Sequence, residues 1–214
     1  MKYLMMSVII FLGTTLLLFI FDRAAEYTSY PFSGHPNYVE PSSFPVFEVD
    51  LENVTYLEDI DSWSAVGICA SLEEGSVLVL SSDGGSMSAG WAMMGCIKDR
   101  DITIAVAKAN SMATAVMLAG SKVCMFAGAE LGFHMPSISV MGERMPLKPI
   151  HLDDILSKAA SHIRGLGYGE AKISYLERFM RLSTSGSKLA AMPQGTMAGI
   201  LGNRFVGTCI EKEV

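Results

Sequence analysis

The sequence is poor in charge and contains no run of basic residues. Only 18% of its 214 residues are charged, and the net charge is −6. Because contacts to nucleic-acid phosphates need clustered lysine and arginine, this composition argues against nucleic acid as a partner. Internal repeats and ATP-binding motifs are also missing, so the sequence leaves open whether an ATPase partner is needed.

Cysteine is sparse as well. The four cysteines, Cys69, Cys96, Cys124 and Cys209, are dispersed and follow no spacing typical of metal ligands. The sequence therefore predicts no metal site, and it favours cysteines that act as small buried hydrophobic residues. A single disulfide is the alternative if the domain lies outside the cytosol.

Hydrophobic residues make up half of the sequence, and the longest hydrophobic run extends from Leu4 to Phe21. This run lies at the lower limit of the roughly 17–25 residues that a helix needs to cross a bilayer. A cleavable signal peptide, with secretion to the periplasm, is the alternative, but Asp22 and Arg23 stand where a cleavage site needs a small residue. We therefore predict an uncleaved membrane anchor in residues 1–25. A lysine before the run favours a periplasmic or extracytoplasmic domain.

The rest of the chain divides into a linker and one domain. Residues 26–45 hold four of the eight prolines among serine, tyrosine, glycine and asparagine, which predicts an extended linker. From residue 46 to residue 214, short apolar runs alternate with helical patterns. Uninterrupted apolar runs are typical of strands buried on both faces, as in parallel sheets.

Two strand–helix–strand units in succession predict parallel strands joined by right-handed crossovers, and hence an α/β fold. The predicted strands cover residues 46–51, 76–80, 102–107, 123–127, 131–134 and 204–210, and the predicted helices cover 60–72, 86–97, 111–119, 151–164 and 170–182.

Three polar features lie at the ends of these runs: the Gly84-Gly85 turn, Ser111 and His134. A serine at the start of a helix is often only its N-cap, and a lone histidine is usually a hydrogen-bonded core residue. Because the carboxyl ends of parallel strands meet at one edge of a sheet, we instead expect Ser111 and His134 to meet as nucleophile and general base. The amides of Gly85 and Met112 would supply an oxyanion hole.

Three sequence blocks carry a family resemblance: Asp83-Gly84-Gly85-Ser86, Asn110-Ser111-Met112 and Phe133-His134-Met135-Pro136. They resemble the glycine turn, the nucleophile and the histidine of the Clp protease proteolytic subunit, whose wider family includes membrane-associated and periplasmic branches and has the crotonase fold. The resemblance covers residues 46–136 well and the remainder loosely. It implies a spiral of strand–helix units and a serine peptidase that acts on peptide or protein substrates through an acyl-enzyme.

The same resemblance implies residue roles: Ser111 as nucleophile, His134 as general base, and Gly85 with Met112 as the oxyanion hole. It implies no cofactor, and it implies subunits that associate into a homo-oligomer. Asp83 replaces the proline that usually precedes the two glycines, and Ala113 replaces a common glycine.

The family's third triad residue, a late aspartate, has no clear counterpart in this sequence. Asn203 is the nearest candidate, and Asp153 and Asp154 are alternatives. This departure leaves two further hypotheses. One is a catalytically weak or inactive scaffold at the membrane, and the other is a crotonase-like acyl-CoA enzyme that uses the glycine turn for a thioester oxyanion.

Overall fold

The structure is a computed structural model that describes residues 38–52, 54–134, 137–140, 143–146, 149–182 and 189–212. These residues belong to one compact unit that begins at Pro36. The predicted anchor lies outside the described residues. Within the described ranges, no helix has both the length and the apolar character needed to cross a bilayer.

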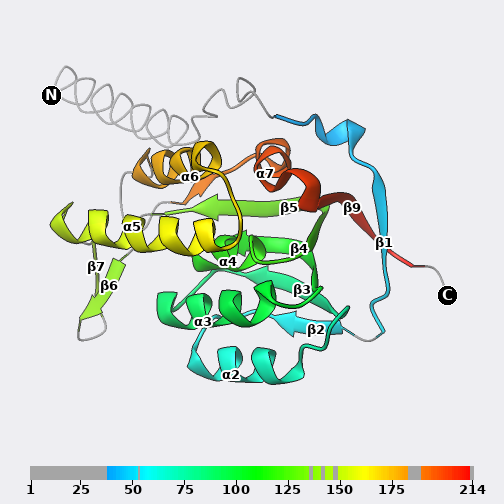
Figure 1. The fold of residues 1–214 in the computed structure, drawn as a ribbon, viewed down its shortest axis with the longest axis horizontal. Coiled ribbons are helices and arrows are strands. Elements are labelled where there is room, and N and C mark those ends of the chain that lie inside the picture. The colour runs from blue at the N-terminus through cyan, green and yellow to red at the C-terminus, as the bar shows by residue number, and fades with distance from the viewer. Residues whose placement is uncertain are drawn as a thin grey trace, which may run out of the picture. The chain divides into compact units, whose positions relative to one another are not determined.

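A sheet of parallel strands organises the domain (Figure 1). Its order is β1-β9-β5-β4-β3-β2, and each neighbouring pair runs parallel, while the short β8 pairs antiparallel with the end of β5. The predicted α/β class with a parallel sheet is therefore confirmed. The strands are β1 (Val46–Val49), β2 (Val54–Leu57), β3 (Val77–Ser82), β4 (Thr103–Asn110), β5 (Lys122–Phe133), β8 (Ala190–Ala191) and β9 (Phe205–Glu211).

Three helices connect the consecutive strands from β2 to β5: α2 (Ser62–Ser71), α3 (Met87–Lys98) and α4 (Met112–Met117). Because each of them joins parallel neighbours, right-handed crossovers place all three on one side of the sheet. The strands between them are buried on both faces. Leu78 and Ile104 are register partners on one face and are fully buried, and Val79 and Ala105 are buried register partners on the other.

The C-terminal part adds further elements: the separate β6–β7 hairpin (Ser137–Val140 and Glu143–Pro146), α5 (Pro149–Gly165), α6 (Glu170–Leu182), α7 (Gln194–Leu201) and the 3-10 helix η3 (Gly202–Arg204). Figure 1 shows the hairpin projecting from the body beside α5. The predicted long helices over residues 151–164 and 170–182 are confirmed as α5 and α6.

Arg204 ties the α5–α6 turn to the end of α4. Its guanidinium donates to the Leu118 carbonyl at 3.1 Å and to the Leu166 carbonyl, and it lies 4.9 Å from the centre of the Tyr168 ring. The Tyr168 hydroxyl donates to the same Leu118 carbonyl at 3.1 Å. Burial raises the pKa of Tyr168 to about 12. These contacts fix the α5–α6 pair on the body at its turn.

All four cysteines form disulfides, so the prediction of unpaired buried cysteines is wrong. Cys69–Cys96 joins α2 to α3, and Cys124–Cys209 joins β5 to β9. The partners lie 27 and 85 residues apart in the sequence. Their pairing depends on which elements become neighbours in the fold, and no local pattern reveals that.

The end of the predicted linker packs on the domain. The Val39 amide donates to the Gly195 carbonyl at 3.1 Å, and the Thr208 amide donates to the Pro45 carbonyl at 2.8 Å. Pro41–Ser43 form a short 3-10 helix, η2. The ordered body therefore begins before residue 46.

Candidate functional site

Ser111 occupies a sharp turn between β4 and α4. Its φ is 56° and its ψ is −124°, and no other non-glycine residue in the described ranges has a positive φ. Such a backbone costs about 1–3 kcal/mol and persists only where the surroundings enforce it. A strained serine on a strand–turn–helix is the arrangement of a nucleophile elbow, which presents the hydroxyl to substrate.

The neighbouring strand holds this turn in place. The Ser111 amide donates to the Gly132 carbonyl of β5 at 2.8 Å. The hydroxyl of the fully buried Thr114 shares its one proton between the Ala109 carbonyl oxygen at 2.7 Å and the same Gly132 carbonyl oxygen at 3.1 Å. The Ser111 side chain makes no capping hydrogen bond to α4, so the N-cap interpretation does not hold.

The Gly84-Gly85 turn lies directly against Ser111. A Cβ atom on Gly84 would lie 2.6 Å from the Ser111 Cβ and 3.0 Å from the Met112 amide nitrogen, and one on Gly85 would lie 2.2 Å from the Ile60 carbonyl oxygen. Both glycines have positive φ, 99° and 151°. Only glycine fits this approach. Within the described part of the chain, the amides of Gly85 and Met112 have no hydrogen-bond acceptor.

His134 follows the end of β5. In the register of β4 and β5, Asn110 pairs with Gly132. Ser111 directly follows Asn110 and donates its amide to the Gly132 carbonyl, two residues before His134. Ser111 and His134 line one pocket of about 530 Å³ together with the glycine turn and Met112. The structure thus brings all the predicted nucleophile, base and oxyanion residues to the same pocket.

The remaining pocket walls are mostly apolar, and two of them come from α5 and α6. They are formed by Trp91, Ala115, Leu118, Phe133, Ile155, Leu156, Ala159, Ile163, Leu176 and Met180. The Trp91 ring stacks on His162 of α5 with 4.5 Å between ring centroids. The sequence pattern predicted helices α5 and α6 but not that they line the pocket. The surface against which a helix packs depends on the tertiary structure and is not visible in the local pattern.

The charged side chains on the pocket wall are three aspartates, Asp59, Asp61 and Asp83. The Asp61 carboxylate accepts from the Ser64 amide at 2.7 Å in the capping box of α2, and this hydrogen bond lowers the pKa of Asp61. Asp83 accepts from Lys108, which lowers the pKa of Asp83. No lysine or arginine lines this pocket among the described residues.

The three candidates for a third triad member lie elsewhere. Asn203 belongs to η3, immediately before β9, whose first residue Phe205 pairs with Val123 near the start of β5. His134 follows the other end of that strand. Asp153 and Asp154 are exposed on α5, and Asp153 pairs with an arginine of α6 at 2.7 Å. None of the three lines the pocket.

A metal site is not formed by the part of the chain that the structure describes. It contains no group of three or more histidine, cysteine, aspartate or glutamate side chains that could hold a metal ion. The groups at the pocket include an alcohol, an imidazole and two backbone amides beside the three aspartates, and the first three kinds of group are those that acyl transfer uses.

Comparisons with known proteins agree with this geometry. The model of the Clp protease family matches residues 69–161, which include Ser111, His134 and the glycine turn. Among solved structures, a mutant of the membrane-bound stomatin-specific protease 1510-N matches with a TM-score of 0.57 and 15% identity, over 75% of this chain and 79% of that chain. The search of curated proteins gave no match. The predicted Clp-like resemblance and fold are confirmed.

Proposed function

We propose that this chain is a serine peptidase that hydrolyses peptide bonds through an acyl-enzyme. Ser111 is the nucleophile, His134 is the general base, and the amides of Gly85 and Met112 form the oxyanion hole. The observation that carries the proposal is the strained backbone of Ser111. Residues held in such conformations, which cost about 1–3 kcal/mol, cluster at active sites, and this one lies on the wall of a pocket.

The proposed reaction uses these groups in order. His134 takes the proton from the Ser111 hydroxyl as its oxygen attacks the peptide carbonyl carbon, and the amides of Gly85 and Met112 stabilise the resulting oxyanion. His134 then gives the proton to the leaving amine. Water, activated by the same imidazole, releases the acyl group and restores Ser111. Since no third-member candidate reaches the pocket, the proposal assigns the chemistry to this pair.

The pocket supports a preference for an apolar side chain next to the cleaved bond. Its volume of about 530 Å³ falls within the range of sites that hold peptide-sized ligands. Apolar walls on α5 and α6 would remove such a side chain from water, whereas a carboxylate would be repelled by the aspartates of the pocket wall. We therefore expect cleavage after large apolar residues and poor cleavage after acidic ones.

The crotonase-like hypothesis explains less of the site. An acyl-CoA enzyme would use the glycine turn, but it has no need of a strained serine beside a histidine. The scaffold hypothesis predicts no chemistry at Ser111 at all. Only the peptidase hypothesis requires the Ser111 hydroxyl for turnover, so a variant without this hydroxyl distinguishes it from both alternatives.

The proposed location is a membrane surface outside the cytoplasm, with the chain anchored by residues 4–21. Two disulfides support this proposal, because disulfides persist in oxidising compartments and are rare in the cytosol. Trapping free thiols during lysis tests it. All four cysteines should resist alkylation until a reductant is added, and four reactive thiols in cells would contradict an extracytoplasmic domain.

We also propose that the subunits associate with one another. Trp63 and Val66 on the outer face of α2 are 85% and 67% exposed, and Tyr56 on the neighbouring edge strand is 61% exposed. Large exposed apolar side chains such as these are candidates for contact surfaces between subunits. Light scattering on the purified chain should give a mass above that of one subunit, and Trp63→Glu should lower it. A monomer at every concentration would contradict association.

The proposed activity is tested by hydrolysis of fluorogenic peptides that carry a large apolar residue before the reporter. Ser111→Ala and His134→Ala should each lower kcat by at least about 10³-fold. Asp154→Asn, an exposed change on α5 away from the pocket, is the matched control and should keep full activity. Hydrolysis that persists in Ser111→Ala would contradict the proposal.

A further inference from the structure

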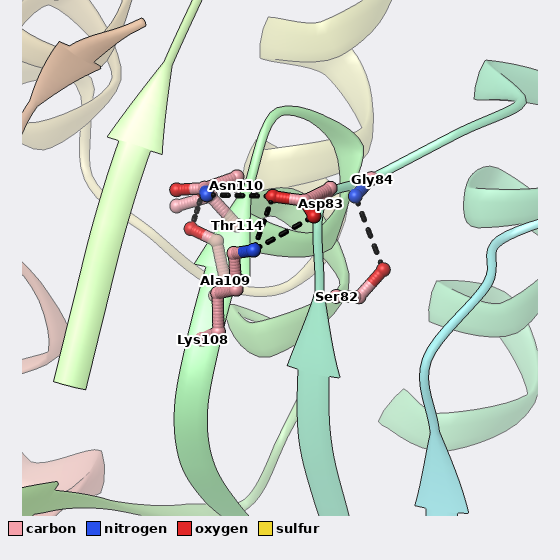
Figure 2. A network of polar contacts seen from close by, with 7 residues as sticks. All are labelled: Ser82, Asp83, Gly84, Lys108, Ala109, Asn110 and Thr114. Atoms are coloured by element: carbon pink, nitrogen blue, oxygen red, sulfur yellow. Dashed lines mark hydrogen bonds and ion pairs between the residues drawn. The ribbon is translucent and has the colours of Figure 1, made fainter.

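A polar network joins the glycine turn to the strand that carries the nucleophile (Figure 2). Asp83 directly follows β3 and precedes Gly84. Its carboxylate accepts from the Lys108 ammonium at 2.7 Å and from the Asn110 amide group at 3.1 Å. Lys108 and Asn110 both belong to β4, and Asn110 is the residue before Ser111. The network therefore spans the two chain segments that must stay in register for catalysis.

Asn110 is the buried member of this network. It is 4% exposed, and its side-chain oxygen has no hydrogen-bond partner. The Asp83 carboxylate is the acceptor for its side-chain nitrogen. Because a buried amide rarely gives up a hydrogen bond, this contact fixes the side chain of Asn110 and, through it, the start of the strained turn at Ser111.

The glycine turn is held from its other side as well. The Gly84 amide donates to the hydroxyl of the buried Ser82 at 3.1 Å, and the Ser86 amide donates to the Ile60 carbonyl at 2.7 Å. These contacts position the turn against β3 and against the chain before α2. Within the described residues, only the Asp83 contacts to β4 connect the side chains of the turn with those of the nucleophile strand.

We propose that Asp83 is a positioning residue that sets the distance between the oxyanion hole and the nucleophile, by holding the glycine turn to Asn110. This inference rests on the proposed peptidase function. It assigns Asp83 no contact with the reacting atoms and no proton transfer. Asp83 holds Ser111 in position through Asn110, and it holds Gly84 and Gly85 in position because they follow it in the chain.

The hydrogen bond to Asn110 contributes more to this positioning than the ion pair with Lys108. The side chains of Asp83 and Lys108 are 77% and 32% exposed, so water screens their attraction, and exposed pairs contribute little. The hydrogen bonds from Lys108 and Asn110 keep the pKa of Asp83 below its ordinary value of 3.8, so the carboxylate stays ionised at neutral pH. Lys108 partly offsets that charge.

The test measures the second-order rate constant for reaction of the 214-residue chain with a fluorophosphonate. This reagent needs Ser111, His134 and the oxyanion hole but no particular peptide. Asp83→Ala should lower the rate constant about 10–100-fold, because a displacement of about 1 Å costs up to about 10²-fold. Asp83→Leu should give the same loss. Asp83→Asn should stay within about threefold of wild type, because its amide oxygen can still accept from Asn110.

The matched control is Asp101→Ala. Asp101 also accepts from a lysine, Lys122 at 3.3 Å, and from the Ser121 hydroxyl at 2.6 Å, but it precedes β4 and so lies at the opposite end of that strand. Its substitution removes a similar exposed network and should leave the rate constant within about twofold. The melting temperatures of Asp83→Ala and Asp101→Ala should shift by similar amounts.

The outcomes separate this inference from the proposed function. No reaction of the wild-type chain would refute the peptidase proposal itself. A reactive wild type with unchanged Asp83→Ala and Asp83→Leu would refute only the role of Asp83. Equal losses in Asp83→Asn and Asp83→Ala would also refute it, because they would show that charge rather than the hydrogen bond matters. With a peptide substrate, the loss in Asp83→Ala should appear in kcat with KM unchanged.

Discussion

Substitution of Ser111 by glycine tests the strain at the centre of the site. Ser111 has φ of 56° and ψ of −124°, a conformation that costs a non-glycine residue about 1–3 kcal/mol. Glycine adopts positive φ without that cost, but it loses about 0.5–1 kcal/mol more conformational entropy on folding than alanine. The difference between the middle values predicts that Ser111→Gly is more stable than Ser111→Ala by about 1 kcal/mol.

The comparison with Ser111→Ala isolates the backbone, because both variants lack the hydroxyl. Urea unfolding of the two variants and of wild type under non-reducing conditions measures the free energy of unfolding. For a domain of this size the expected difference corresponds to a rise in Tm of about 2–4 °C. Neither variant should hydrolyse peptides, so the more stable protein is also an inactive one.

The result that would refute this reasoning is a Ser111→Gly variant no more stable than Ser111→Ala. It would mean that the turn between β4 and α4 carries no strain in solution. The principal argument for a nucleophile elbow would then be lost, even if the pocket around it stayed intact.

Three further predictions concern other parts of the account. Gly84→Ala places a methyl group 2.6 Å from the Ser111 Cβ, so kcat for peptide hydrolysis should fall at least about 100-fold, and near-normal kcat would contradict the close approach. Loss of the Cys124–Cys209 disulfide by double alanine substitution opens a cross-link between residues 85 apart and should lower the free energy of unfolding by about 4 kcal/mol in urea titrations. Asn203→Ala should hydrolyse peptides within about twofold of wild type, and a tenfold loss would contradict its distance from the pocket.

That Ser111 and His134 line one pocket could be predicted, because it follows from strand direction. Each lies just beyond the carboxyl end of an apolar run, and parallel neighbours bring such ends to one edge. The pairing of Asn110 with Gly132 places the residues before Ser111 and before His134 on neighbouring strands. The glycine turn also lies just beyond the carboxyl end of a parallel strand, β3. Its proximity to Ser111 could therefore be predicted from the sequence as well.

Elements without a periodic pattern could not be predicted. In α7, every residue from Gly195 to Leu201 is buried, so the helix has no polar face that could produce an amphipathic signal. The sequence predicts two strands, 123–127 and 131–134, separated at Gly128. In the structure they are one strand, β5, with an irregularity, because residues on both sides of Gly128 pair with β4. Backbone pairing with a neighbour overrides the local turn signal of a glycine.

The side-chain network around Asp83 left no signal in the sequence for a related reason. Asp83 and its partner Lys108 are 25 residues apart, and their contact depends on the register of β3 with β4. In the same way, the sequence showed that α5 and α6 are amphipathic but not that their apolar faces complete the pocket. The local sequence pattern indicates where helices and strands begin and end. Which of these elements pack against one another is decided by the tertiary structure.

The central claim is that His134 activates Ser111 for attack on a carbonyl. Its most direct test is peptide mapping by mass spectrometry after reaction of the chain with a fluorophosphonate. The account predicts one adduct, on Ser111, which forms in the wild type and is lost in His134→Ala. No adduct, an adduct on another serine, or equal labelling of Ser111 in the absence of the imidazole would contradict it.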